Sequence, residues 1–363
     1  MPPSEQLSDL PPSVDLETRP VLKALSAANR ALGELKGRAA TIPNPGILVD
    51  TLTLQEARAS SEIENIVTTQ DELFQAQLFP QRSGSAAAKE VGRYSSALKL
   101  GFERLRQRHA IITNNDLIDM FRLLKMRQNE GFRSVPGTVL RHEGTGQVVY
   151  EPPQDAREIV RLMGALETFI NDDSACSLDP LIKMALIHHQ FESIHPFSDG
   201  NGRVGRILNV LYLTKTGLLE APTLYLSRYI TQHKDAYYRL LQSVRTHDTW
   251  EEWVLYMLAA VTETAEVTLR QVSGIRDQMA DVKRRMRTEL PRIYSQEMLN
   301  NLFRHPYTRI GFVVNDLGVT RQTAAKRLKD LAAHGFVTEH RAGRSSYYVN
   351  DDLVGLFLTA SHS

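Results

Sequence analysis

The sequence HPFSDGNGRVGRIL, residues 195–208, places a histidine, an acid, two glycines around an asparagine, and two arginines within one short stretch. The preceding segment, LIKMALIHHQFESI, and the following segment, RVGRILNVLYL, both have the apolar pattern of helices. The stretch is therefore predicted to be a tight loop that leads into the N-terminus of a helix. Helix N-termini carry unpaired amide groups and the positive end of the helix dipole, so we expect an anion site here.

The residue types of this loop suit a polyphosphate. Gly200 and Gly202 leave the backbone bare, so phosphate oxygens can approach it closely. Arg203 and Arg206 are three residues apart and share one face of the first helical turn, where two guanidinium groups can bind phosphates. The side-chain amide of Asn201 can donate a hydrogen bond to a phosphoryl oxygen.

Two further side chains of the loop favour an enzyme. Asp199 lies beside the expected phosphates and is placed to hold Mg²⁺. His195 can act as the base that takes a proton from an attacking hydroxyl. A zinc site is disfavoured, because His188, His189 and His195 lack metal-site spacing and a clear fourth ligand. We therefore expect His188 and His189 to pack within a helix.

Composition indicates an ordinary globular protein. The chain has 363 residues, 42% hydrophobic and 23% charged, with a formal net charge of +1. That charge excludes a global field that would attract nucleic acid or membrane. The single cysteine, Cys176, excludes an internal disulfide framework and suits a reducing compartment. The N-terminus has neither the basic nor the apolar region of a signal peptide, and no apolar run reaches the ~18 residues of a membrane span. A cytoplasmic location without membrane contact is expected.

The stretch HPFSDGNGRVGR matches in full the signature of the Fic family, His-x-Phe-x-Asp/Glu-Gly-Asn-Gly-Arg-x-x-Arg, and the resemblance extends over roughly residues 115–250. Members of this family are mostly protein adenylyltransferases, which move AMP from ATP onto a Ser, Thr or Tyr hydroxyl of a protein. The resemblance implies a mainly α fold: a Fic-type helical core with a β-hairpin flap. It also implies ATP as substrate, Mg²⁺ as cofactor, and as protein substrates both the chain itself and an unknown target.

The resemblance also assigns site residues. It implies His195 as general base, Asp199 as the Mg²⁺ ligand and Phe197 as the buried anchor of the loop. Tyr237 and Tyr238, in HKDAYYRLLQSVR, resemble the adenine-side wall, although aromatic residues on a helix are more often core. The hairpin around Val148 and Val149 resembles the flap to which a target segment adds as a strand, with an ordinary surface hairpin as the alternative. The ATP-binding positions implied are Glu64, His195, Gly200, Asn201, Gly202, Arg203, Val204, Gly205, Arg206, Tyr237 and Tyr238.

The segment SSEIEN, residues 60–65, resembles the inhibitory motif of the family, Ser/Thr-x-x-x-Glu-Gly/Asn, with Ser60, Glu64 and Asn65 in register. A carboxylate on Arg206 would take the place of the γ-phosphate. ATP could still bind, but with its α-phosphate misplaced for attack, and a small misplacement can cost ~100-fold in rate. We therefore expect a weakly active resting protein. The alternative for this short motif is a solvated helix end.

The C-terminal part changes character after Pro291. Its order of helix, turn with Gly318, helix capped by Thr320, and hairpin is typical of a winged helix-turn-helix domain. Contact with DNA and docking of protein both remain open for this domain. The basic residues of 320–349 are Arg321, Lys326, Arg327, Lys329, Arg341 and Arg344, against the acidic Asp330 and Glu339.

The predicted division of the chain has four parts: an N-terminal helical region with the inhibitory helix, 1–112; the Fic core, 113–255; a linker helix, 256–296; and the winged helix-turn-helix, 297–363. Residues 249–289 form one long helical pattern whose seven-residue repeat fits either a coiled-coil seam or an internal packing helix. Its repeat positions are Ala265, Val272, Met279 and Met286.

Three alternative functions remain. The same site could remove AMP from a modified protein, with Glu64 positioning water, or it could use a different nucleotide donor. The chain could also be a transcriptional regulator whose core senses nucleotide. The presence of His195 favours chemistry over sensing, because a sensor needs the phosphate clamp but no base. The sequence leaves open the target, the modified residue and a homodimer.

Overall fold

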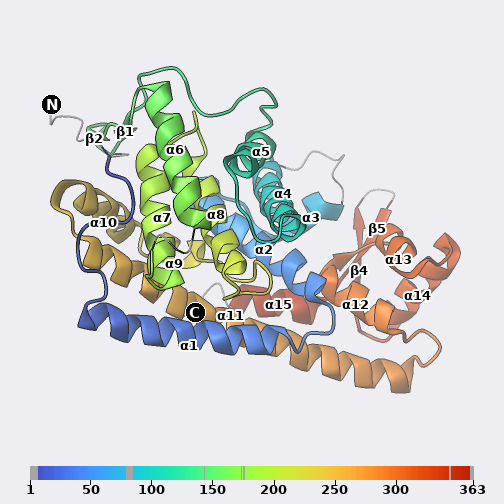
Figure 1. The fold of residues 1–363 in the computed structure, drawn as a ribbon. Helices are drawn as coiled ribbons and strands as arrows, with labels where there is room; N and C mark the ends of the chain where they lie inside the picture. The colour runs from blue at the N-terminus through green and yellow to red at the C-terminus, as the bar shows by residue number, and fades with distance from the viewer. Residues whose placement is uncertain are drawn as a thin grey trace.

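The computed structural model describes residues 7–78, 85–142, 144–172, 174, 176–342 and 345–359, and the chain in it is mainly helical (Figure 1). The helices up to the central loop are α1 (Arg19–Ala39), α2 (Pro45–Ile63), α3 (Gln70–Leu78), α4 (Ala86–Gln107), α5 (Asn114–Lys125), α6 (Ala156–Asn171) and α7 (Pro180–Ile194). Those after it are α8 (Asn201–Lys215), α9 (Ser227–Gln232), α10 (Lys234–His247), α11 (Trp250–Glu289), α12 (Gln296–Arg304), α13 (Ile310–Leu317), α14 (Arg321–Ala333) and α15 (Asp351–Thr359). The strands are β1 (Leu140–Arg141), β2 (Val148–Tyr150), β3 (Tyr307–Thr308), β4 (Thr338–Ala342) and β5 (Ser345–Val349).

Helices α7 and α8 pack together at the centre of the molecule, as the run of apolar residues on both sides of the loop predicts. Every residue of α7 from Leu181 to its end is buried. The helix begins where Asp179 accepts a hydrogen bond from the amide of Leu181 and where Pro180 takes the first helical position. The loop between α7 and α8 therefore connects two helices that pack on each other in the core.

The 40-residue helix α11 is about 60 Å long, and α1 lies along it (Figure 1). Its repeat positions are all buried within this chain, which favours internal packing over a coiled-coil seam; they are Ala265, Val272, Met279 and Met286. The same helix continues from the core to the C-terminal elements. The predicted boundary at residue 255 falls inside α11, and the division into four parts stays a prediction.

The apolar pattern of the sequence predicts a break at IPNPG and a helical stretch from near Asp50 or Thr51, but α2 starts earlier than this. The helix begins at Pro45, because the Asn44 side chain accepts from the amide of Gly46 at 2.9 Å and Pro45 occupies the first position. Proline fits there, since its missing N–H would have no partner in the first turn. The segment IPNPG, which suggested only a break, therefore also starts the next helix.

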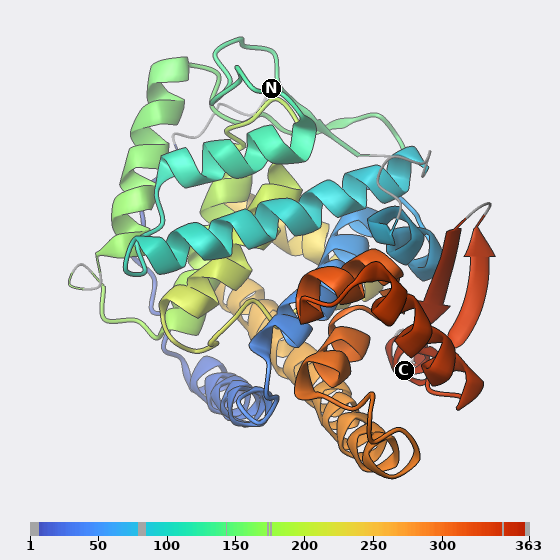
Figure 2. The ribbon, with the colours of Figure 1, turned by 90° about the vertical axis from the view of Figure 1, so that its right-hand side faces the viewer.

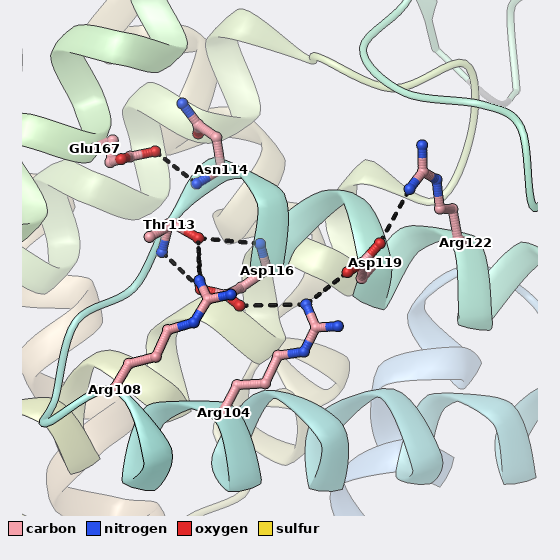
Figure 3. A network of polar contacts seen from close by, with 8 residues as sticks. All are labelled: Arg104, Arg108, Thr113, Asn114, Asp116, Asp119, Arg122 and Glu167. Carbon is pink, nitrogen blue, oxygen red and sulfur yellow. Dashed lines mark hydrogen bonds and ion pairs between the residues drawn. The ribbon is translucent and has the colours of Figure 1, made fainter.

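A polar network fixes α5 against α4 and α6 (Figure 3). Thr113 and Asp116 form a capping box at the start of α5. Arg104 on α4 and Arg108, which follows the helix, reach the Asp116 carboxylate at 3.3 and 3.0 Å. The first amide of α5 donates to Glu167 on α6 at 2.6 Å. Helix α5 is thereby held in place beside the central loop.

The remaining β-structure forms two small sheets. Strands β1 and β2 pair antiparallel as the predicted hairpin, with Leu140 opposite Tyr150. The second sheet is antiparallel with the order β3-β5-β4. It lies with α12, α13, α14 and α15 at one side of the molecule, against α2, α3 and α11 (Figure 2). Residues 296–359 are called the C-terminal region below; within it, α13, α14 and the β4–β5 pair follow in the order of helix, helix and hairpin that the sequence predicts.

Within the described residues, no helix combines the length and the apolar character that crossing a membrane requires.

Candidate active site

Two left-handed residues shape the loop between α7 and α8. His195 ends α7 with φ 50° and ψ 57°, and Gly200 precedes α8 with φ 76°. Between them, Phe197 is fully buried and its ring stacks on Phe121 of α5 with 4.3 Å between centroids. Phe197 thus anchors the loop, as the resemblance implied, and the two left-handed residues turn the chain sharply from α7 into α8.

The side chain of Asn201 closes the loop. Its Oδ1 accepts from the amide of Phe197 at 2.8 Å, and its Nδ2 donates to the carbonyl of Phe197 at 2.9 Å. The side chain is 1% exposed. The Asn201 side chain therefore fixes the backbone of the loop at Phe197. Direct donation from Asn201 to a phosphoryl oxygen stays a prediction.

Arg133 fixes the start of the loop and was missed by the sequence analysis. Its Nε donates to the carbonyl of His195 at 2.8 Å and its Nη2 to that of Ile194 at 3.3 Å. The backbone amide of Arg133 also donates to the carbonyl of Pro196 at 2.8 Å. Burial lowers the pKa of this guanidinium, which stays charged at neutral pH. Nothing in the surrounding GFRSVPG marks the residue, because its partners are main-chain atoms far along the chain.

His195 has the protonation state that a general base requires. Burial of the ring, with Arg245 and Arg133 nearby, lowers its pKa to about 4. The imidazole is therefore neutral near pH 7 and can accept a proton. Its Nδ1 is buried and has no hydrogen-bond partner among the described residues.

Asp199 lies at the mouth of the loop, with 56% of its side chain exposed, and pairs with Lys125 of α5 at 2.5 Å. Partial burial opposes ionisation of Asp199, but the Lys125 ammonium and the Arg203 guanidinium lower its pKa. In the part of the chain that is described, no group of three or more His, Cys, Asp or Glu could hold a metal by itself. One carboxylate together with substrate phosphates is nonetheless a ligand set that Mg²⁺ commonly has. Asp199 fits that role once Lys125 releases it.

The first two turns of α8 contain the free amides and the two arginines of the loop motif, both of which are buried. The amide of Val204 already donates to the carbonyl of Gly200 at 3.1 Å, so the amides before it are those left for an anion. The side chains of Val204 and Arg203 are buried, and Arg203 contacts Glu90 of α4 at 2.5 Å. Any contact of Val204 with phosphate would therefore come from its backbone.

Arg206 is held by the end of α2. It is 1% exposed, and its Nε donates to Ser60 Oγ at 2.8 Å. Its Nη2 donates to the carbonyl of Ser60 at 2.9 Å and to Glu64 Oε1 at 2.8 Å. A Cβ on Gly202 would lie 2.6 Å from Glu64 Oε1, so only glycine leaves room for this carboxylate. Ser60 and Glu64 thus meet Arg206 as the inhibitory motif predicted.

Asn65 ends α2 immediately after Glu64. Its φ is 60°, and the amide of Ile66 donates to the carbonyl of Ser61 at 3.0 Å, which is the pattern of a Schellman motif. Asparagine tolerates the left-handed conformation better than most residues. The third residue of the motif therefore stops the helix where Glu64 can reach Arg206. Burial opposes ionisation of Glu64, but the Arg206 guanidinium lowers its pKa, so the carboxylate is charged.

Glu192 is a second carboxyl close to this pair, which the sequence analysis did not single out. It is 7% exposed, and its Oε1 has no hydrogen-bond partner within the described chain. Burial raises the pKa of Glu192 to about 7. A Cβ on Gly205 would lie 2.7 Å from Oε1, so Gly205 lets α8 approach this carboxyl on α7.

The two tyrosines of α10 have different surroundings. Tyr237 is 1% exposed, and its hydroxyl lies 2.8 Å from His188 Nε2, so the structure places it in the core. Tyr238 is 45% exposed and remains the candidate for the adenine side. His188 and His189 are both buried, and His189 Nε2 lies 3.2 Å from the carbonyl of Leu241. Both histidines pack within the helical core, as predicted.

The hairpin is attached close to His195. The Tyr150 hydroxyl donates to the carbonyl of Ser193 at 3.0 Å, and the Arg245 guanidinium lies 4.0 Å from the centre of the Tyr150 ring. On the same strand, Val148 and Val149 are 45% and 41% exposed. The hairpin thus presents apolar side chains at the surface while its base is fixed to the end of α7. Its use as a flap for a target stays a prediction.

Comparison with known proteins gives three family matches, two of them on adjoining segments. Residues 22–103 match the model of the Fic/DOC family N-terminal region, residues 104–213 that of the Fic/DOC family, and residues 278–353 that of the SoFic-like protein adenylyltransferase C-terminal domain. A probable protein adenylyltransferase of Aquifex aeolicus is 28% identical over 200 residues, which are 52% of this chain and 56% of that protein. A protein adenylyltransferase of Aedes aegypti is 32% identical over 96 residues, 26% of this chain and 18% of that protein.

A solved structure shares the fold. The crystal structure of a Fic family protein from Desulfovibrio desulfuricans has a TM-score of 0.56 at 21% identity, over 94% of this chain and 98% of that one. The sequence matches span about half of the Aquifex protein and less than a fifth of the mosquito protein. The likeness of fold therefore covers far more of the chain than the likeness of sequence.

Proposed function

Because this chain belongs to the Fic/DOC family, whose models match consecutive segments of it, we propose that it is a protein adenylyltransferase that uses Mg²⁺ and ATP and is held weakly active by Glu64. The observation that carries the proposal is that Ser60 and Glu64 both accept hydrogen bonds from Arg206. This arginine lies 11 residues after His195, whose lowered pKa keeps it neutral near pH 7. The same arginine is needed for the γ-phosphate, so one contact explains both a binding site and its inhibition.

The residues support a direct transfer. A Ser, Thr or Tyr hydroxyl gives its proton to neutral His195 while its oxygen bonds to the α-phosphorus of ATP. The bond to the bridging oxygen breaks, pyrophosphate leaves, and AMP stays on the protein as a phosphate ester. The amides at the start of α8 and the two arginines bind phosphate oxygens, which positions the α-phosphorus. Phe197, Asn201 and Arg133 keep the base and this helix end in fixed relation.

Mg²⁺ would be held by Asp199 and phosphate oxygens, and would neutralise charge on the leaving pyrophosphate. Lys125 pairs with Asp199 here and would have to move aside. Lys125 Nζ also lies 3.5 Å from Glu90 Oε1, so the ammonium keeps a carboxylate partner when it leaves Asp199.

Incubation with labelled ATP and Mg²⁺ tests the proposal. We expect Glu64→Gly to raise self-modification by about 100-fold, because it frees Arg206 for the γ-phosphate. Glu62→Ala is the control, since Glu62 lies in the last turn of α2 two residues before Glu64, and alanine removes the carboxylate without weakening the helix, so the rate should be unchanged. A rate equal to that of the unaltered chain in both variants would exclude the inhibitory role of Glu64.

The reverse reaction is the second candidate, favoured by one feature of Glu64. Only Oε1 of this carboxylate bonds Arg206, while 34% of the side chain is exposed. A charged, accessible Oε2 could accept a proton from water that attacks an AMP ester. Loss of AMP from a modified protein, abolished by Glu64→Gly, would assign this direction.

We further propose that the C-terminal region contacts duplex DNA through α14. Arg321, Lys326 and Lys329 are exposed on this helix, which packs against α13 and β4. A basic face on the second helix of a helix-turn-helix is the usual footprint of DNA binding. Arg344, the other residue expected to reach DNA, lies outside the described residues. Docking of a protein on the same face is the alternative.

A gel-shift titration of the full chain at low salt separates these two possibilities. We expect modest affinity for random duplex that falls steeply as salt increases. Arg321→Ala should reduce preference among sequences, because residues at the start of a recognition helix reach base edges. No retardation at about 100 μM protein, where even non-specific binding should appear, would end the DNA proposal.

A further inference from the structure

The C-terminal region contacts the helix before Glu64 and the helix after it. Helix α2 lies before Glu64 and α3 follows it after a short connection. Arg58 near the end of α2 donates to Gln70 Oε1 at the start of α3 at 3.1 Å, and this hydrogen bond links the two helices. The C-terminal region contacts each of them separately.

The first contact joins α12 to α2. Arg304 Nε donates to Asp50 Oδ2 at 2.5 Å, and Lys99 of α4 contacts the other oxygen of the same carboxylate. Only 20% of the Asp50 side chain is exposed. A charge-assisted hydrogen bond at a mostly buried carboxylate is among the stronger polar contacts in proteins. It ties the first half of α2 to both the core and the C-terminal region.

The second contact joins β3 to α3. The Tyr307 hydroxyl donates to Asp71 Oδ1 at 2.8 Å. The ring of Tyr307 also stacks on Phe74, with centroids 4.9 Å apart and an interplanar angle of 15°. Phe74 and Tyr307 are 2% and 9% exposed, so this contact is apolar and closed to solvent. Stacked aromatic pairs add specific geometry to the burial of their surface.

The ring contact continues through the whole sheet. Tyr307 on β3 stacks on Tyr347 of β5 at 6.0 Å, and Tyr347 stacks on His340 of β4 at 5.2 Å. One row of rings therefore runs from α3 across all three strands. The position of α3 is fixed by the sheet as a whole, and a displacement of the sheet would be transmitted to α3.

We propose that the C-terminal region is a latch on the inhibitory helix: its contacts at Asp50 and Asp71 stabilise the arrangement in which Glu64 reaches Arg206. The latch rests on the proposed inhibitory function of Glu64. Releasing either contact lowers the free-energy difference between the inhibited and open arrangements, so a larger fraction of molecules has Arg206 available. A partner that displaces the sheet would have the same effect without touching the active site.

Two variants of the full chain break one contact each. Tyr307→Phe keeps the ring stack and removes the hydrogen bond to Asp71, and Arg304→Gln removes the charge next to Asp50. We expect either to raise self-modification from Mg²⁺ and ATP by about tenfold, the loss expected for one charge-assisted hydrogen bond. Hydrogen–deuterium exchange of residues 60–78 should rise in parallel, and this readout does not depend on activity.

Tyr348→Phe is the matched control. Tyr348 is the next residue on β5, and its hydroxyl lies beside Glu339, away from the row of rings. The same chemical change in the same sheet should leave both readouts unchanged. In the Glu64→Gly background, Tyr307→Phe and Arg304→Gln should add nothing to the rate, because the carboxylate that the latch positions is absent.

The outcomes separate the latch from the proposed function. If Glu64→Gly activates the chain and the latch variants change neither the exchange of residues 60–78 nor the rate, the latch is wrong while the inhibition stands. If exchange rises in the latch variants but neither they nor Glu64→Gly change the rate, the inhibitory function is wrong. Activation by the latch variants that persists in full in the Glu64→Gly background would also overturn the latch.

Discussion

Arg133 binds main-chain carbonyls of the loop, so its loss should displace His195 without altering its chemistry. In the Glu64→Gly background we expect Arg133→Met to lower kcat by about 100-fold, with the KM for ATP nearly unchanged, because a small displacement of a catalytic group has that effect on rate. Its guanidinium makes two of the hydrogen bonds that hold the turn. Steady-state kinetics with varied ATP gives both constants.

Arg127→Met controls for the loss of an arginine near the same loop. Arg127 is 46% exposed and pairs with Glu130 at the surface, and its contact with the loop is a long one, 3.4 Å, to the exposed Ser198 hydroxyl, so the variant should keep its kcat. A KM for ATP that rises as kcat falls in Arg133→Met would show that Arg133 serves nucleotide binding rather than the position of His195.

The pKa of His195 sets the acid limit of activity. Burial of the ring lowers this pKa from 6.5 to about 4, with Arg245 and Arg133 adding to the shift and Glu64 opposing it. Only the unprotonated ring accepts a proton, so a lowered pKa extends activity toward acid. We expect kcat/KM in the Glu64→Gly background to stay level from about pH 8 to 6 and to fall below about pH 5. Initial rates across this range, with recovery at neutral pH as a test for unfolding, check it. A midpoint near 6.5 would contradict the buried environment of the base.

At the scale of the element, the end of α2 decides whether Glu64 reaches Arg206. Asn65 adopts φ 60°, which costs an ordinary L-residue about 1–2 kcal/mol and costs glycine little. We therefore expect Asn65→Gly to keep the low resting rate. Asn65→Val should raise self-modification by roughly tenfold, since a β-branched residue resists the left-handed turn. Labelled ATP measures both variants. Equal rates for the two would show that the helix end has no part in inhibition.

The loop, α8 and the end of α2 show which features can be predicted from the sequence. The loop, the helix that follows it and residues 60–65 are local patterns: the loop leads into α8 as predicted, and Ser60 and Glu64 contact Arg206. The inhibitory role of residues 60–65 stays a prediction. The start of α2 was placed too late because Pro45 was interpreted as a breaker, although a proline after a capping asparagine also begins helices. Arg133 and Glu192 were missed for another reason. Arg133 acts on a residue 62 positions away, and the unusual pKa of Glu192 comes from burial. Neither leaves a periodic or spacing signal.

At the scale of the whole molecule, α11 packs against helices of the core and against helices of the C-terminal region. Helix α15 packs on α11, and Gln278 Nε2 donates to the carbonyl of Asp352 at 3.0 Å. Gly274 allows this approach, because a Cβ there would lie 2.3 Å from Leu356 Cδ1. The latch contacts on α2 and α3 depend on this docking, since the same region reaches the inhibitory segment and α11 together.

Substitution of Gly274 therefore tests whether docking on α11 controls the distant active site. Gly274→Ala should be nearly neutral, because the Leu356 side chain can rotate away and alanine favours the helix. Gly274→Val adds a stiff branched side chain and should destabilise the docked arrangement by about 1–3 kcal/mol. We expect the valine variant to show faster hydrogen exchange in α15, a lower Tm and higher self-modification. Faster exchange in α15 together with an unchanged rate would mean that the contacts at Asp50 and Asp71 hold the inhibitory segment without help from α11.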